Sequence, residues 1–266
     1  MLKSFESDID VIENISPFVL PSFKVDELVR AVQRYPSLDE AKKDFRKRKI
    51  VLPPETGIVV IYNNKVIDYI DIPGNYYWLG TETNLKSCKY AKFLDWDVKQ
   101  FEQEIQNVLN QDDFYIYALN IHDLHSFPLF VENPLPFKDT RYGDLLVRFY
   151  CSIDARVTNP FAALARLIIR KKDVLMGTDL FVGKEDLIRQ NFYESLNEAT
   201  ADKVYSFESP EGLEFSLSPI LLPKLFKILY KEFGIHGNKI NINSILPDAI
   251  SKDIIEEIDT KQVYKT

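Results

Sequence analysis

The sequence predicts an α+β protein, with a strand-rich antiparallel first half and a helix-containing α/β second half. Apolar runs of strand composition dominate up to residue 157. Helix-like spacing of apolar residues dominates 185–233, and strict alternation returns at 238–245. With 266 residues, 45% of them hydrophobic, the chain is long enough for one large domain or two closely packed small ones.

The first 48 residues are predicted to form a mainly helical N-terminal extension. Apolar residues between Val25 and Val32 recur at the spacing of one helix face. Ser37 followed by Glu40 fits a capping box at the start of a second helix. The extension runs into a basic cluster that comprises Lys42, Lys43, Arg46, Lys47, Arg48 and Lys49.

This basic cluster has two interpretations. As a binding site, it would attract anionic lipid or an acidic partner, because each basic residue adds to the attraction of a negative surface. As a local feature, it places positive charge at a helix C-terminus, where the helix dipole favours it.

A two-stranded hairpin is predicted next. The apolar runs 57–62 and 65–70 flank Asn63-Asn64, and a two-residue loop of this kind needs positive φ at both positions. Asparagine tolerates that conformation better than any residue except glycine. Pro73-Gly74 then ends the hairpin as a turn.

The middle of the chain alternates between the two periods. Residues 95–110 carry apolar side chains on one helix face, whereas 113–121 return to strand composition. The prolines of 132–139 predict a loop. Residues 145–157 alternate apolar and polar side chains almost without exception, so we expect a long antiparallel strand with one wet face. Cys151 then points into the core as a small apolar residue.

The second half is predicted to contain three helices and one further strand. Asn159-Pro160 supplies an N-cap and a first-turn proline. The second helix buries a stripe made of Ile188, Phe192, Leu196 and Ala199. In the third helix, within 218–234, Pro223 must lie in the first turn and Gly234 ends the helix. Its buried face is predicted to contain Leu222, Leu225, Phe226, Leu229 and Phe233.

Composition argues against several classes of protein. A net charge of −7 argues against nucleic-acid binding, which normally needs a basic face. The two cysteines, Cys88 and Cys151, form no disulfide framework and fit reduced thiols in the cytoplasm. The N-terminus lacks signal-peptide features, and no run reaches the ~18–20 apolar residues of a membrane span. Any membrane contact is therefore expected to be peripheral.

The sequence offers no catalytic, cofactor-binding or metal site, and no small-molecule ligand is predicted. His122 and His125 would share a face only on a helix, and the strand-like residues before them place the two on opposite faces. Glycine-rich phosphate-binding motifs are missing, and no pair of carboxylates stands out as a general acid and base. We therefore predict a protein that is not an enzyme.

Several motifs in order resemble an SPFH domain (the stomatin, prohibitin and flotillin superfamily, also called Band 7), closest to its soluble virion core protein-like branch. The run KIVLPPETGIVVIYNNKVIDYIDIPGNYYWLGTET, at 49–83, is similar to the opening of such a domain. LPFKD at 135–139, DLLVRFYCSIDARV with the following NPFAALARL, and YKEFGIHGNKININSI at 230–245 resemble later landmarks. RYP at 34–36 resembles a motif that precedes the domain in that branch.

The chain also departs from that pattern. The helical segment 95–110 looks like an insertion, and PLFV at 128–131 stands where a Phe-Gly-Thr element is expected. We expect no coiled coil after residue 247, which places the formation of large cages in doubt, and no cysteine-rich ribbon closes the chain.

The resemblance implies an SPFH-like domain at 49–247, with subdomains at roughly 49–140 and 141–247 and a charged tail at 248–266. It further implies a non-enzymatic scaffold or adaptor that forms homo-oligomers or docks protein partners. A peripheral membrane-binding module that uses the basic cluster 42–49 is the first alternative. A hydrolase built on scattered acidic residues is the second. The expected location is cytoplasmic, with membrane association left open.

Overall fold

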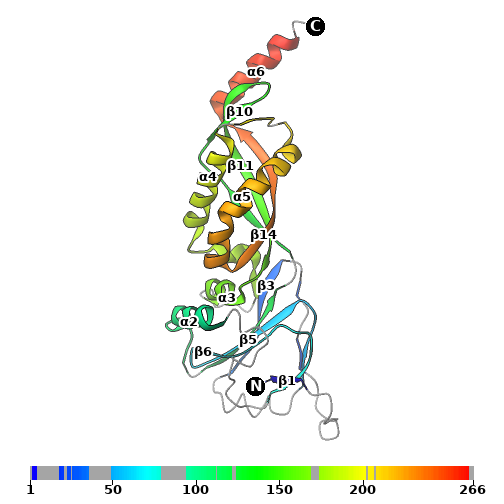
Figure 1. The fold of residues 1–266 in the computed structure, drawn as a ribbon, viewed down its shortest axis with the longest axis vertical. Coiled ribbons are helices and arrows are strands. Elements are labelled where there is room, and N and C mark those ends of the chain that lie inside the picture. Colours follow the sequence, from blue (N-terminus) through cyan, green and yellow to red (C-terminus); the bar gives the residue numbers. More distant parts are fainter. Residues whose placement is uncertain are drawn as a thin grey trace. The chain divides into compact units, whose positions relative to one another are not determined.

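The computed structural model confirms a mixed α+β protein with mainly antiparallel sheets (Figure 1). The chain divides into two compact units whose segments interleave in sequence. Unit 1 comprises Met1–Asp123, Val157–Leu180 and Glu232–Ile235, and unit 2 comprises Leu124–Arg156, Phe181–Lys231 and His236–Thr266. The structure describes residues 2–4, 18–20, 23–24, 26–35, 49–78, 94–111, 113–121, 124–168, 174–201, 203–206 and 208–263.

The described residues of unit 1 form two sheets. The larger has the order β12-β3-β8-β5-β6 and comprises β3 (Glu27–Tyr35), β5 (Thr56–Tyr62), β6 (Lys65–Ile70), β8 (Phe114–Asn120) and β12 (Val174–Met176). The smaller has the order β1-β7-β4-β2 and comprises β1 (Leu2–Ser4), β2 (Phe18–Val19), β4 (Lys49–Leu52) and β7 (Gly74–Trp78). The helical elements are α2 (Leu94–Ile105), α3 (Pro160–Ile168) and the 3₁₀ helix η4 (Gly177–Phe181), whose last residue belongs to unit 2.

The predicted hairpin is confirmed as β5 and β6. Asn63 and Asn64 form its two-residue turn with φ of 53° and 57°, the left-handed conformation that such a turn requires. The turn is also tied to α2, because the Asn64 side-chain amide donates to the Gln106 carbonyl over 3.0 Å. The predicted helix at 95–110 is confirmed over its first part as α2, which ends at Ile105 and buries Phe101 and Ile105, whereas residues 106–110 are not helical.

The helix predicted around residues 25–32 is wrong, because Glu27–Tyr35 form strand β3. This strand lies inside the larger sheet of unit 1, with β8 on one side and β12 on the other. Leu28 and Val29 are consecutive and both buried, a pattern that fits a strand covered on both faces. Pairing with two neighbours therefore outweighed the helix-like spacing. The capping-box segment lies outside the described residues.

Unit 2 contains one sheet and three helices. The sheet has the order β13-β10-β11-β14, with β9 also paired to β11, and comprises β9 (His125–Phe130), β10 (Leu135–Asp139), β11 (Gly143–Val157), β13 (Val204–Tyr205) and β14 (Ile235–Pro247). The helices are α4 (Glu185–Thr200), α5 (Pro210–Phe233) and α6 (Ala249–Val263). The turn at residues 140 and 141, where the sequence analysis placed a subdomain boundary, lies in unit 2.

The loop predicted at 132–139 is wrong in its second half, because Leu135–Asp139 form strand β10. Pro136 faces Leu146 of β11 in this ladder. The Leu146 amide donates to Ser251 Oγ over 2.7 Å, and its carbonyl accepts from the Asp248 amide over 2.9 Å. Both groups of Leu146 thus point away from β10, so Pro136 sits where the ladder requires no N–H.

The long strand and the helix that follows it are confirmed. Every second residue of β11 from Leu145 to Val157 is buried, Cys151 among them. Asn159 caps α3, since its Oδ1 accepts from the amides of Phe161 and Ala162, both over 3.2 Å. Pro160 is the first residue of α3, as the sequence predicts.

Helix α5 differs from the prediction at its start and on one face. It begins at Pro210 and continues through Pro219 and Pro223, so the expected first-turn position of Pro223 is wrong. The helix tolerates both prolines because leucines at every fourth position are packed in the core. The free energy of this packing exceeds the cost of the backbone hydrogen bonds that the prolines remove. This buried series comprises Leu213, Leu217, Leu221, Leu225, Leu229 and Phe233. Phe226, predicted on the buried face, is 45% exposed.

The strand and helix that close the described chain are β14 and α6. Ile240 and Ile242 of β14 are buried, which confirms the strand predicted at 238–245. The predicted charged tail is helical over Ala249–Val263, directly after β14. No helix in the described part of the chain is both long and apolar enough to cross a membrane.

Candidate functional site

Most of the basic cluster predicted as a binding site lies outside the described residues. Lys42, Lys43, Arg46, Lys47 and Arg48 all fall in that part of the chain. Lys49 is the first residue of β4. The prediction that this cluster binds a membrane or a partner therefore remains a prediction.

The histidine and cysteine candidates lie in the core where the structure describes them. His125 is buried at the start of β9, with its ring 6.1 Å from that of Phe127. Burial, with a smaller contribution from the Glu214 charge, raises the pKa of the Cys151 thiol to about 12. The thiol is therefore protonated at neutral pH, as expected of a core residue. His122 and Cys88 lie outside the described residues, among which no three potential metal ligands come together.

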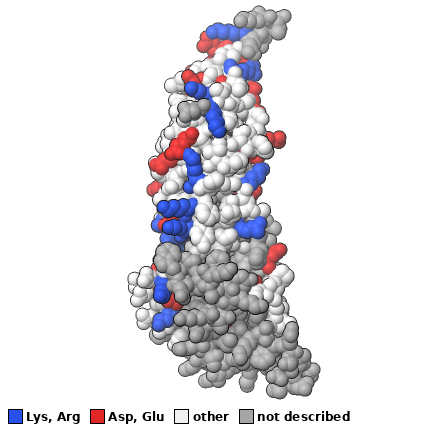
Figure 2. Space-filling view, viewed as in Figure 1, with Lys and Arg blue, Asp and Glu red and all other residues white. Residues whose placement is uncertain are grey.

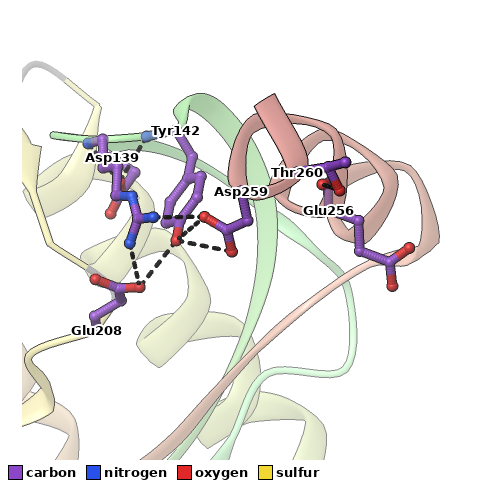
Figure 3. Close-up of polar contacts among 7 residues, drawn as sticks. Asp139, Tyr142, Glu208, Glu256, Asp259 and Thr260 are labelled. Carbon is purple, nitrogen blue, oxygen red and sulfur yellow. Dashed lines mark hydrogen bonds and ion pairs between the residues drawn. The ribbon is translucent and has the colours of Figure 1, made fainter. Parts of the chain in front are cut away.

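A cluster of polar side chains gathers where the β10–β11 hairpin turns (Figure 3). Asp139 shapes this turn, because its Oδ1 accepts from the amides of Arg141 and Tyr142 over 2.7 and 2.9 Å. Gly143 closes the turn with a φ of +77°. The turn thereby presents two side chains, Arg141 and Tyr142, to the rest of unit 2.

Arg141 and Tyr142 meet two carboxylates from distant parts of unit 2, and we call these four residues the tip cluster. Arg141 lies 2.6 Å from Asp259 of α6 and 3.3 Å from Glu208, which precedes α5. The Tyr142 hydroxyl lies 2.9 Å from Glu208 Oε1 and 3.1 Å from Asp259 Oδ1, with one proton to donate between them. The cluster thus joins the hairpin, the α5 entrance and α6.

The tip cluster favours a neutral tyrosine. Burial, together with the hydrogen bonds to Glu208 and Asp259, raises the pKa of Tyr142 to about 12, although the Arg141 charge acts in the opposite direction. A phenol held this firmly in its protonated form is a hydrogen-bond donor and not a base. The contacts of Arg141 and Tyr142 with Asp259 tie α6 to the β10–β11 hairpin.

A second set of contacts fixes the start of α6. The Ser251 hydroxyl and the Asp248 amide bond both backbone groups of Leu146, over 2.7 and 2.9 Å. Asp248 also caps the helix, because its Oδ1 accepts from the Ser251 amide over 2.8 Å. Hydrogen bonds from Ser251 lower the pKa of the Asp248 carboxyl. Helix α6 is therefore held at two points, at its first turn and at Asp259.

An apolar groove of about 320 Å³ lies beside the first turns of α6. Its walls come from β10, β11, the end of α4 and α6, and include Pro136, Leu146, Thr200, Ile250 and Ile254. Ile250 is 66% exposed at the edge of this groove. An exposed isoleucine therefore lies directly beside a recess of the same unit.

Helix α5 carries a partly exposed apolar stripe outside its leucine series. Phe215 is 86% exposed and Phe226 45% exposed. Pro219 between them is exposed, and Leu222 and Tyr230 are half-buried. We call these five residues the α5 stripe. Uncharged side chains cover much of the described surface in the face that Figure 2 shows, with basic and acidic side chains toward both margins.

Sequence reasoning missed both the tip cluster and the α5 stripe. The members of the cluster come from the hairpin, from residue 208 and from residue 259, so only the folded chain brings them together. The stripe did leave a signal in the sequence. Phe215 falls outside the four-residue series of leucines, and that series would have placed it on the exposed face.

Comparisons with known proteins give no family assignment. No protein-family model matches the chain. A search of curated proteins also found no significant match.

Proposed function

We propose that this protein is a non-enzymatic, SPFH-like scaffold that associates with copies of itself and docks other proteins. The observation that carries the proposal is helix α6, which follows β14 without a break and presents isoleucines at every fourth position. Ile250 is 66% exposed, and Ile254 and Ile258 are half-buried. Such spacing forms one apolar stripe that a neighbouring helix can cover.

The geometry of α6 supports a role in assembly. The helix is held at its first turn by Asp248 and Ser251 and near its end by Asp259, so its isoleucines keep a fixed orientation. A surface that is ordered before binding loses less entropy when a partner covers it. The groove beside Ile250 offers a recess for an apolar side chain of a second copy.

The proposal also draws on the order of motifs in the sequence. In the superfamily that the chain resembles, a helix begins after the strand that corresponds to 235–247, and here α6 begins at Ala249. The sequence predicts no coiled coil at this point. Because α6 is short in the described chain, we propose small homo-oligomers and not a cage.

The test is the mass of the protein in solution, measured for wild type and for two variants of α6. Ile250→Glu places a charge in the proposed contact and is expected to shift the protein toward monomer. Lys252→Glu changes an exposed residue of the same helix turn and serves as the matched control. If the Ile250→Glu variant and the wild type form oligomers of equal mass, the result argues against self-association through α6.

A further inference from the structure

The α5 stripe is not needed for the fold of unit 2. The leucine series of α5, which includes Leu217 and Leu225, is buried and faces the core. Phe215 lies on the opposite side of the same turns, where it buries almost none of its surface. Leaving an aromatic side chain in water gains nothing for stability, whereas covering its apolar surface is favourable.

A second face of α5 protects the sheet edge and is also distinct from the stripe. Ser218 Oγ lies within hydrogen-bond distance of both the amide and the carbonyl of Ile240, at 3.3 and 3.1 Å. Glu214 Oε1 accepts from the Ile242 amide over 2.8 Å. These contacts cover the outer edge of β14 with residues that do not belong to the stripe.

The spacing of the stripe is that of a helix-binding surface. Phe215, Pro219, Leu222, Phe226 and Tyr230 follow one another at intervals of four, three, four and four residues. At 1.5 Å per residue, the stripe extends over about 22 Å, or roughly four helical turns. At its far end the Phe226 ring stacks on Tyr230 at 5.8 Å and meets the His236 ring edge-on at 5.6 Å. These contacts hold an aromatic platform that still has an exposed side.

Positive charge lies beside the C-terminal half of the stripe. Lys224, Lys227 and Lys231 of α5 are exposed, and Lys227 and Lys231 directly follow the stripe residues Phe226 and Tyr230. Lys239 is exposed on β14. Lys224 pairs with Glu198, and Lys239 pairs with Glu214 at 3.0 Å. Within the described part of the chain, neither Lys227 nor Lys231 has an ion-pair partner. This positive margin stands out in a protein whose net charge is −7.

From this combination we infer that the α5 stripe is the docking site for an acidic amphipathic helix of a protein partner. The apolar residues of that helix would cover Phe215 and Phe226, while acidic residues on its flanks would face Lys227 and Lys231. Helix-on-helix recognition of this kind depends on apolar anchors at i, i+4 and i+7, and flanking charges select the partner. The inference rests on the scaffold function proposed above and names the chemistry of one docked partner.

The experiment measures binding of two fluorescein-labelled helical peptides to the full-length protein by fluorescence anisotropy. Both peptides carry leucines at i, i+4, i+7 and i+11, and they differ only in having Glu or Lys at the flanking positions. The Glu peptide is expected to bind at least tenfold more tightly than the Lys peptide, with a difference that shrinks as salt rises. Equal binding of the two peptides would overturn the inference.

Variants of exposed residues locate the site. Phe215→Ser is expected to weaken binding of the Glu peptide at least tenfold, because truncating the most exposed aromatic anchor of the stripe removes much of the affinity. The combined variant Lys227→Glu and Lys231→Glu should invert the preference between the two peptides. Leu187→Ser alters another exposed apolar residue, on α4, and should leave binding unchanged. Binding that is insensitive to Phe215→Ser would overturn the inference.

Two further measurements separate this inference from its competitors. If Phe215→Ser lowers the mass of an oligomer, the stripe is covered by a second copy and the inference fails. If the wild type floats with phosphatidylserine vesicles and Phe215→Ser does not, the stripe is a membrane surface, and the inference again fails. A monomeric protein that binds the Glu peptide through Phe215 would instead support the inference while contradicting self-association.

Discussion

Gly234 is the residue whose substitution tests the described fold of unit 1 most sharply. It follows α5 with a φ of +66°, where any other L-residue is disfavoured by about 1–2 kcal/mol. A Cβ at this position would lie 2.1 Å from the Asn159 carbonyl oxygen and 2.7 Å from the Ala163 amide nitrogen. Both are backbone atoms at the start of α3, so they cannot yield as a flexible side chain would.

The displacement caused by Gly234→Ala also disturbs two hydrogen bonds. The Gly234 carbonyl accepts from the amides of Thr158 and Asn159 over 2.8 and 2.9 Å. Each bond contributes about 0.5–1.5 kcal/mol. Together with the unfavourable φ, we expect Gly234→Ala to lower the free energy of unfolding by about 2–5 kcal/mol.

Urea unfolding followed by circular dichroism measures this effect, with Gly183→Ala as the matched control. Gly183 has a φ of +77°, but a Cβ there would meet nothing within 4 Å. Its substitution should therefore show the conformational cost alone, about 1–2 kcal/mol. If both variants lose the same free energy of unfolding, the result contradicts a close approach of Gly234 to α3.

Three further predictions concern separate parts of the molecule. Tyr142→Phe should lower the free energy of unfolding at neutral pH. Because folding raises the Tyr142 pKa from 10.0 to about 12, the stabilisation by the hydroxyl is complete below pH 10 and is lost as the pH rises toward 12. The urea midpoints of the wild type and the variant should therefore converge over that pH range. Asn64→Ala should destabilise the β5–β6 turn by about 1–2 kcal/mol, whereas Asn64→Gly, which tolerates the positive φ, should cost less; both variants remove the bond to Gln106, so equal losses would show that the turn conformation contributes nothing measurable. If the basic cluster binds membranes, Lys47→Glu, Arg48→Glu and Lys49→Glu together should abolish flotation with anionic liposomes, and unchanged flotation would remove the peripheral membrane alternative.

The parts of the fold that the sequence predicted follow local rules. The Asn63-Asn64 turn, the Asn159-Pro160 helix start and the alternation of β11 each depend on residues next to one another in the chain. Strand β3 was missed because its pairing with β8 and β12 involves residues far along the sequence. Strand β10 was missed for a related reason, since only the direction of the Leu146 backbone shows that Pro136 fits the ladder.

The candidate site was less accessible to sequence reasoning than the fold. Arg141 and Tyr142 meet Asp259 across more than a hundred residues, and no local pattern marks that contact. The prolines of α5 suggested a helix start at the wrong place, because the leucine series that holds the helix together begins at Leu213. Phe226 was assigned to the core because it lies four residues after Leu222, whereas the buried face follows the series through Leu221, Leu225 and Leu229.

The measurement that tests the central claim most directly is the absolute mass of the purified protein by light scattering over a wide range of concentrations. We predict a defined multiple of 30.9 kDa that persists on dilution and falls to one chain in Ile250→Glu. A mass of one chain at every concentration would contradict self-association through α6.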